Sequence, residues 1–141
     1  MFVYSNGYYH ARSIDGHGKS WDKWLKQYIQ KFYYDIPKGW RICGECLYAK
    51  HSIEYKFPND EFLFQVFSIY DERNVCLSFE QTWMWCDLLG IKEVPIIYVG
   101  KYDKNKILKA FNEYKSKQNN EVEGFVIRNI DEFKYEDFSK N

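Results

Sequence analysis

The run Leu63-Phe64-Gln65-Val66-Phe67-Ser68-Ile69-Tyr70-Asp71 decides the fold, because it is a nearly continuous stretch of apolar and aromatic residues. Such a run is typical of a β-strand that is covered on both faces. We therefore predict a strand from Phe62 to Tyr70. The shorter run Trp40-Arg41-Ile42-Cys43-Gly44-Glu45 predicts another strand earlier in the chain.

A β-hairpin is predicted at the start of the sequence. Ser5-Asn6-Gly7 separates the aromatic-rich runs 2–4 and 8–11, and Asn-Gly is a strong hairpin signal because both residues tolerate positive φ. A hairpin at the first residue leaves an edge strand with nothing before it to cover it. We therefore expect the sequence to be a piece of a longer protein.

An amphipathic helix is predicted after Ser20. Residues at helical spacing are apolar, lysines and glutamines occupy the other side, and the helix ends before Pro37. A row of lysines like this one is usually a solvent-exposed face, and contact with phosphate is the less frequent alternative. The apolar residues are Trp21, Trp24, Leu25, Tyr28, Ile29 and Phe32.

The second half of the chain predicts two more helices and two more strands. Ser78-Phe79-Glu80-Gln81 fits a capping box that opens a helix through Leu89, which Gly90 ends. A third helix is predicted from Lys104 to Lys115, and short strands at 95–99 and 124–130. Antiparallel hairpins with peripheral helices give an α+β fold class.

The composition is that of one domain. The 141 residues suffice for a single core, and the 20 basic residues balance the 20 acidic ones, so any nucleic-acid contact must rest on a local patch. No window resembles a membrane span or a signal peptide, so we expect a cytoplasmic protein without a membrane partner. Aromatic residues make up 21% of the chain, which suits a packed sheet or base stacking.

The four cysteines do not predict a metal site. Cys43 and Cys46 lie three apart in a predicted strand, so period-two alternation sends their sulfurs to opposite faces. Cys76 and Cys86 are not a second pair at zinc spacing. We expect mostly buried thiols.

Four segments in order resemble the RNA-ligase branch of the covalent nucleotidyltransferases. They are His10-Ala11-Arg12-Ser13, the run 44–53 from Gly44-Glu45 through Tyr48-Ala49-Lys50-His51-Ser52-Ile53, the strand around Phe67, and Glu123-Gly124-Phe125-Val126-Ile127-Arg128. The resemblance spans almost the whole chain. It implies a truncated nucleotidyltransferase (ATP-grasp-like) fold, with residues 1–141 forming part of a ligase adenylyltransferase domain.

The resemblance also implies a chemistry and a role for each site residue. In this family a lysine takes AMP from ATP with the help of Mg²⁺, and the AMP activates an RNA or DNA 5′-phosphate for attack by a 3′-hydroxyl. Glu123 would be the catalytic residue that faces the metal and the α-phosphate. Among the nucleotide-binding residues, Phe67 would stack on adenine, Glu45 would bind the ribose, and Arg12 would bind phosphate or ribose.

Each of these roles has a structural alternative. Phe67 could be a core residue, and Arg12 an exposed cation at a strand end. Glu45 and Glu123 sit beside glycines in apolar runs, where a carboxylate is costly unless it is paired or metal-bound. Pairing with Arg41 or Arg128 is the alternative for both.

Two family motifs are missing from the sequence. The nucleophilic lysine of Lys-x-Asp-Gly should stand shortly before the first hairpin, but residues 1–12 contain no lysine, and we interpret the likeness of Ser13-Ile14-Asp15-Gly16 to this motif as accidental. No basic Lys-x-Lys or Lys-x-x-Arg element is evident after the last predicted strand. We therefore expect this chain alone to form no lysyl-AMP, unless another polypeptide segment supplies the missing motifs. A non-catalytic nucleotide- or RNA-binding module, and a structural domain with an open sheet edge, remain alternatives.

Overall fold

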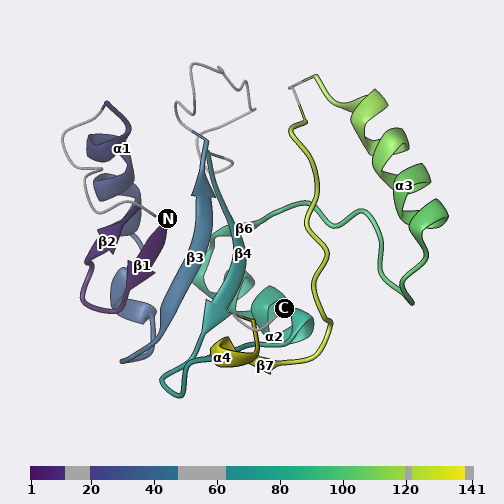
Figure 1. Cartoon of the computed structure of the whole chain (residues 1–141). Coiled ribbons are helices and arrows are strands. Elements are labelled where there is room, and N and C mark those ends of the chain that lie inside the picture. Colours follow the sequence, from purple (N-terminus) through teal and green to yellow (C-terminus); the bar gives the residue numbers. More distant parts are fainter. Residues whose placement is uncertain (12–19, 48–62, 120–121, 139–141) are drawn as a thin grey trace.

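The computed structural model of the chain describes residues 1–11, 20–47, 63–119 and 122–138, and it has the predicted α+β class (Figure 1). A seven-stranded sheet forms its centre. The strands lie in the order β2 (Tyr9–His10), β1 (Phe2–Tyr4), β3 (Arg41–Cys46), β4 (Phe64–Tyr70), β5 (Val75–Cys76) and β7 (Phe133–Lys134), with β6 (Lys92–Glu93) also beside β4.

The sheet is antiparallel except at one pair, because β6 runs parallel to β4. The predicted hairpin is confirmed: β1 and β2 pair antiparallel, and Gly7 adopts a φ of 85° between them. The predicted strands at 40–45 and 62–70 are confirmed as β3 and β4. These two strands lie side by side over their whole length.

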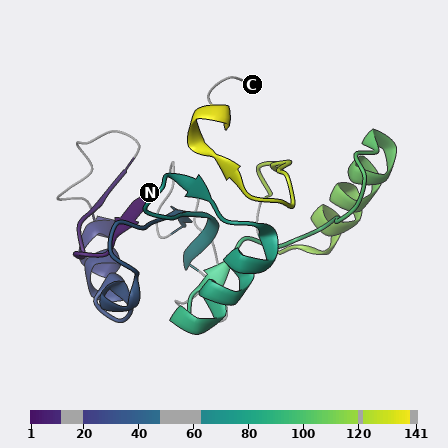
Figure 2. The ribbon, with the colours of Figure 1, turned by 90° about the horizontal axis from the view of Figure 1, so that it is seen from below.

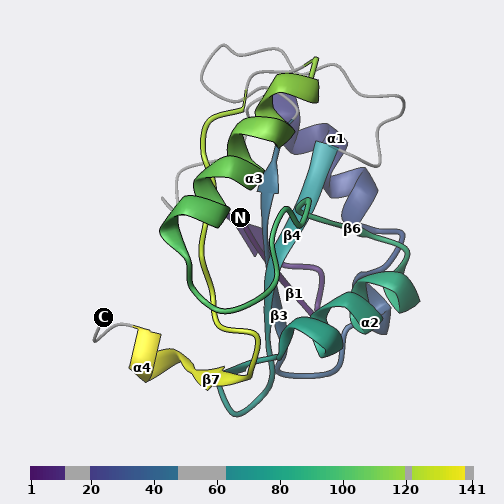
Figure 3. The ribbon, with the colours of Figure 1, turned by 90° about the vertical axis from the view of Figure 1, so that its right-hand side faces the viewer.

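Two helices cover one face of the sheet. They are α1 (Ser20–Ile29), which continues into the short 3-10 helix η1 (Tyr33–Asp35), and α2 (Phe79–Leu89). Seen from below, α1 and α2 lie on one side of the sheet and α4 (Tyr135–Phe138) lies on the other (Figure 2). Helix α3 (Lys104–Lys117) stands apart from the sheet at the right of Figure 1, and in the side view it lies toward the viewer (Figure 3). No helix in the described ranges is long and apolar enough to cross a membrane.

The main core lies between the sheet and these two helices, on what we call the helix-covered face. Alternate strand residues point into it and meet the apolar side of α1, as its spacing predicts. The side chains of this cluster that are almost fully removed from solvent include Val3, Leu25, Ile29, Ile42, Phe64, Val66 and Ile69.

We call the other side of the sheet the opposite face, made by Phe2, Cys43, Glu45, Gln65 and Tyr70. These residues are paired in register across β1, β3 and β4, or alternate with residues of the helix-covered face. A second, smaller cluster of Cys43, Tyr70 and Cys76 packs here with Phe2 and Phe133. The side chains of β3 and β4 therefore divide between two environments.

The helix boundaries follow local capping signals. The Oγ atom of Ser78 accepts a hydrogen bond from the Gln81 backbone N–H at 3.2 Å, and Gly90 ends α2 in the left-handed conformation with a φ of 70°. This is the capping box that the sequence predicts. The side chain of Asp103 caps α3 in the same way, accepting from the Lys106 N–H at 3.1 Å.

Two predicted strands are wrong. Residues 95–99 are irregular, and the hydrogen bond from the Val94 backbone N–H to the Val66 carbonyl oxygen lies just before them. Residues 124–130 are also irregular. The edge of β4 that faces them already carries β6 and β5, so no length of backbone remains there for another strand.

Candidate nucleotide-binding site

Glu45 and Gln65 form a polar pair in the middle of the opposite face. They are direct partners in the antiparallel register of β3 and β4, so their side chains leave the sheet on the same side. Glu45 is half-buried and Gln65 is only 8% exposed. Since polar side chains are costly to bury without partners, this pair marks the opposite face as chemically distinct from the core.

Phe67 sits in a β-bulge between this pair and the end of β4. Cys43 pairs with Ser68, but the next residue, Gly44, pairs with Val66, so Phe67 is the extra residue of β4. A bulge re-aims the side chains around it, and bulges are common beside functional sites. Phe67 follows Val66, which points into the core, and precedes Ser68, which pairs with Cys43 of the opposite face, so Phe67 lies where the alternation along β4 is interrupted.

The exposure of Phe67 separates it from the core. Its side chain is 40% exposed, whereas Phe64 and Val66 in the same strand are fully buried. The alternative that Phe67 is a plain core residue is therefore wrong. An aromatic face that remains accessible in the middle of a sheet is available for stacking on a ring.

Arg128 ties the Glu123–Arg128 segment to the same strand. Its guanidinium donates to the Phe67 carbonyl oxygen through Nη1 and to the Leu77 carbonyl oxygen through Nη2, each at 2.8 Å. Along this edge of β4, the Val94 N–H donates to the Val66 carbonyl and the Leu77 N–H donates to the Ile69 carbonyl. Arg128 donates to the Phe67 carbonyl, which lies between them. The two motif segments, 61 residues apart, meet at this contact.

Glu123 lies on the irregular segment that leads to Arg128, and its side chain is exposed. The expectation that Glu123 sits inside an apolar strand is therefore wrong, and its carboxylate needs no metal or arginine to offset burial. Five residues of extended chain span at most ~18 Å, so the Cα atom of Glu123 lies within that distance of the Cα atom of Arg128, whose side chain contacts the Phe67 strand. On the other side, Phe125 packs on Phe111 of α3 with ring centroids 4.9 Å apart.

Glu45 and Phe67 are thus brought to neighbouring strands, and Glu123 is tethered to them through Arg128. Arg12 lies outside the described residues, as does the run 48–53 that carries part of the resemblance. Arg41 and Arg128 were the structural alternatives as partners for the two glutamates. Arg41 donates to the side chain of Asn74, and Arg128 donates to backbone carbonyls.

Aromatic and thiol groups next to the site are held uncharged. Burial raises the pKa of Cys43 to about 12 and the pKa of Tyr70 to about 12. Arg41 stacks on Tyr70, with the guanidinium carbon 4.2 Å from the ring centroid. The net charge of this part of the opposite face therefore comes from arginine, not from ionised sulfur or phenol.

No metal cluster is preformed in the described part of the chain, where no three His, Cys, Asp or Glu side chains come together. All four cysteines are described, and none forms a disulfide. Cys43 and Cys46 pack in different clusters, on the two faces of the sheet, as the alternation predicts. Mg²⁺ is often held by only one or two carboxylates together with substrate phosphates, so a site of this kind needs no preformed cluster of protein ligands.

Sequence reasoning missed two features of this site. Gln65 was visible as the polar residue inside the apolar run 63–71, and that break in the pattern is the signal of the opposite face. The bond from Arg128 to the Phe67 carbonyl has no local signal, because it depends on a bulge and on two strand edges.

A comparison with known families gives one match. The RNA ligase family model matches residues 1–141. Neither the curated proteins nor the solved structures contain a match. The match covers the whole length of the sequence, and this chain therefore belongs to the RNA ligase family.

Proposed function

We propose that this chain binds ATP or AMP on the opposite face of its sheet, as part of the nucleotidyltransferase domain of an ATP-dependent RNA ligase. The observation that carries the proposal is the shared position of Glu45 and Phe67. One is a carboxylate and the other an accessible aromatic ring, on adjacent strands and beside a bulge. A nucleoside needs both, because its base offers a flat face and its sugar offers hydroxyl donors.

Phe67 and Glu45 bind different parts of the nucleoside. Phe67 stacks on adenine, since an accessible aromatic face binds a base without reading its edge. Glu45 accepts hydrogen bonds from the ribose hydroxyls, and a charged acceptor makes such bonds stronger than a neutral one. Gln65, beside Glu45, offers an amide that can donate to the same sugar.

Glu123 and Arg12 act at the phosphates. In this proposal Glu123 is the protein ligand of Mg²⁺, which neutralises charge on the phosphate oxygens when it is bound. Arg12 donates to a phosphate or to the ribose. Arg128 is a positioning residue, because it fixes the segment that carries Glu123 to β4.

The covalent steps need a lysine that the sequence does not present in the family's motif. A lysine amine would attack the α-phosphorus of ATP, pyrophosphate would leave, and lysyl-AMP would form. The AMP would pass to a nucleic-acid 5′-phosphate, and a 3′-hydroxyl would displace it to make the phosphodiester bond. Residues 1–12, which include the first hairpin, contain no lysine, so we propose that another segment or polypeptide supplies it.

A non-catalytic nucleotide-binding module is the second candidate. The missing Lys-x-Asp-Gly favours it, since the sequence presents no motif lysine to form the phosphoramidate. In this case the opposite face binds the nucleotide in the same way, but no AMP is transferred.

Two measurements test these candidates. Calorimetric titration of the chain with ATP in Mg²⁺ is expected to show binding, and lack of binding overturns both candidates. Incubation with α-labelled ATP, followed by denaturing electrophoresis, then compares this chain with a version extended by a segment that carries Lys-x-Asp-Gly. Label on the extended version alone supports the ligase, whereas ATP binding without label on either supports the binding module.

A further inference from the structure

Lys92 shares the opposite face with Glu45 and Gln65. In the parallel pairing of β4 with β6, Gln65 is the partner of Lys92 and Val66 is the partner of Glu93. Paired residues of neighbouring strands leave the sheet on the same side. Lys92 therefore lies on the side of Gln65, and Glu93 lies on the side of Val66.

The neighbours of Lys92 support this placement independently. Ile91 belongs to the core on the helix-covered face, and one carboxylate oxygen of Glu93 is buried. Since alternate residues of a strand point to opposite faces, Lys92 between them points away from the helices. Lys92 itself is half-buried, so part of this residue is covered by the protein.

Glu45, Gln65 and Lys92 form a row across three adjacent strands. Two spacings of about 4.8 Å separate the outer strands, so the carboxylate and the ammonium stand on either side of Gln65 with backbones about 10 Å apart. A nucleotide has the same order of charge, with neutral hydroxyls at the ribose and anionic oxygens at the phosphates. A row with an acceptor at one end and a cation at the other fits both ends of such a ligand.

We infer that Lys92 binds a phosphate group of the nucleotide whose ribose is held by Glu45. The inference rests on the proposed function and adds a phosphate-binding residue outside the motifs that carry the resemblance. Lysine suits this role because its ammonium is a compact charge on a flexible four-carbon stem. Phe67 then lies further along the same strand as Gln65, and Lys92 lies beside Gln65 on the neighbouring strand β6.

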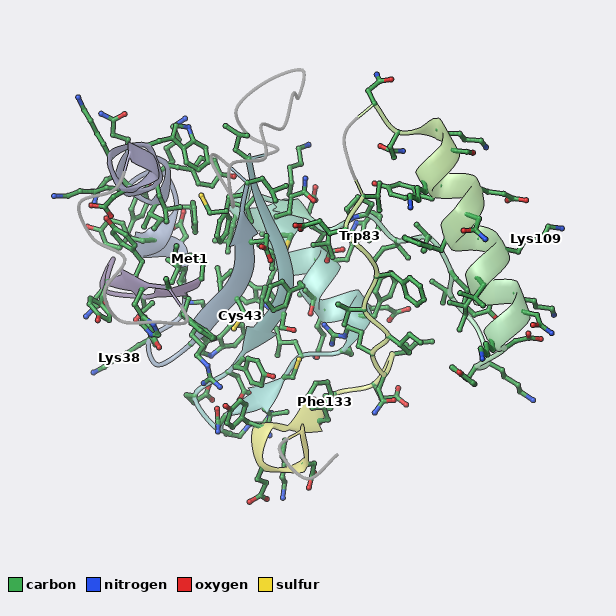
Figure 4. The ribbon with its side chains drawn as sticks, turned by 45° about the horizontal axis from the view of Figure 1, so that its top comes forward. Met1, Lys38, Cys43, Trp83, Lys109 and Phe133 are labelled. Carbon is green, nitrogen blue, oxygen red and sulfur yellow. The ribbon has the colours of Figure 1, made fainter. Side chains whose placement is uncertain are left out.

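The test compares adenosine with AMP on the full chain and on two variants. Lys92→Met removes the charge and keeps the stem, and Lys109→Met is the control, because Lys109 projects from α3 away from the sheet (Figure 4). We expect Lys92→Met to weaken AMP binding roughly ten- to a hundredfold, the effect of losing a hydrogen bond to a charged group. Adenosine binding, which uses no phosphate, is expected to change by less than about twofold.

The outcomes separate this inference from the proposed function. If the parent chain binds neither AMP nor adenosine, both fail. If the parent binds both and Lys92→Met matches Lys109→Met with AMP, only the phosphate role of Lys92 is overturned. Equal loss of AMP and adenosine assigns Lys92 a structural role and also overturns it, and Lys92→Arg, which keeps the charge, is expected to retain most of the AMP affinity.

Discussion

The guanidinium of Arg128 donates a 2.8 Å hydrogen bond to the backbone carbonyl of Phe67, joining the last motif segment to the bulged strand of the sheet. The same guanidinium reaches the carbonyl of Leu77, so one side chain holds β4, the chain just after β5 and residues 122–130 together. This contact explains how an irregular, exposed segment keeps a defined place beside the sheet.

Replacing Arg128 with methionine is expected to lower the free energy of unfolding by about 1–3 kcal/mol, because two carbonyls lose charged donors. Hydrogen exchange of the backbone amides at 122–130 should accelerate more than that of β3. Urea unfolding and exchange mass spectrometry measure the two effects. Arg128→Lys keeps the positive charge but lacks the paired donors of the guanidinium, so its stability and its exchange rate should lie between those of the parent and of Arg128→Met. Unchanged exchange at 122–130 in Arg128→Met would show that the contact does not position the segment.

Phe67→Ala is expected to weaken ATP binding by about 1–3 kcal/mol, the loss of one stacked base, and to leave stability nearly unchanged. Phe64→Ala in the same strand is the contrast. Phe64 is fully buried, so its truncation should cost about 3–5 kcal/mol of stability. Calorimetric titration and urea unfolding of both variants test the pair. A large stability loss in Phe67→Ala with normal ATP affinity would mean that Phe67 is a core residue and does not stack on the base.

Glu45→Ala is expected to lower ATP affinity by about 1–3 kcal/mol, because a charged acceptor for the ribose is lost. The parent chain should bind ATP more tightly than 2′,3′-dideoxy-ATP, and the variant should bind the two alike. Titration with both nucleotides measures the difference. Equal discrimination in the parent and the variant would mean that Glu45 does not bind the sugar.

The parts of the fold that the sequence predicted have local causes. Asn6-Gly7 sets its own turn, the residues from Ser78 to Gln81 cap their own helix, and the apolar run that includes β4 needs only to be buried. The parts that it missed depend on distant residues. Residues 124–130 have strand-like composition, but the edge of β4 is already paired with β6 and β5. Residues 95–99 also have strand-like composition, but they form no strand beyond the bond from Val94 to Val66.

The candidate site also has features that the sequence predicts locally and features that depend on distant residues. Glu45 and Phe67 could be chosen from the sequence because each lies in a strand that the pattern predicts. The position of Phe67 in a bulge could not be predicted, because the bulge is a property of the register between β3 and β4. The relation of Glu123 to the sheet likewise depends on one arginine bond across 61 residues.

Asp71 gives the fold a defined acid dependence. Burial alone would raise the pKa of Asp71, but hydrogen bonds from the Arg73 side chain and from the backbone N–H groups of Val75 and Arg73 outweigh it and lower the pKa. A carboxylate with a lowered folded-state pKa stabilises the fold above its unfolded value of about 3.9. That contribution is lost as the pH falls through the folded pKa.

Asp71→Asn should therefore be less stable than the parent at pH 7, and the difference should shrink as the pH is lowered below about 4. Urea unfolding at a series of pH values measures both curves. Asp87→Asn is the control, because Asp87 is exposed on α2. A difference between Asp71→Asn and the parent that is constant with pH would show that the ionised carboxylate contributes nothing beyond its shape.

The glycines beside the two motif glutamates, Gly44 and Gly124, should respond differently to replacement by alanine. A Cβ atom at Gly44 would lie 2.8 Å from the Gln65 carbonyl oxygen and 2.8 Å from the Phe64 ring, whereas a Cβ at Gly124 meets nothing within 4 Å. Gly44→Ala is therefore expected to cost about 1–3 kcal/mol of stability, because the bulged pairing of β3 and β4 must open to admit it. Gly124→Ala should be neutral or stabilising by up to about 1 kcal/mol, since it only restricts the unfolded chain. Thermal and urea unfolding of the two variants decide between them. If Gly44→Ala unfolds like Gly124→Ala, the close approach of β3 to β4 at the bulge is not what requires glycine beside Glu45.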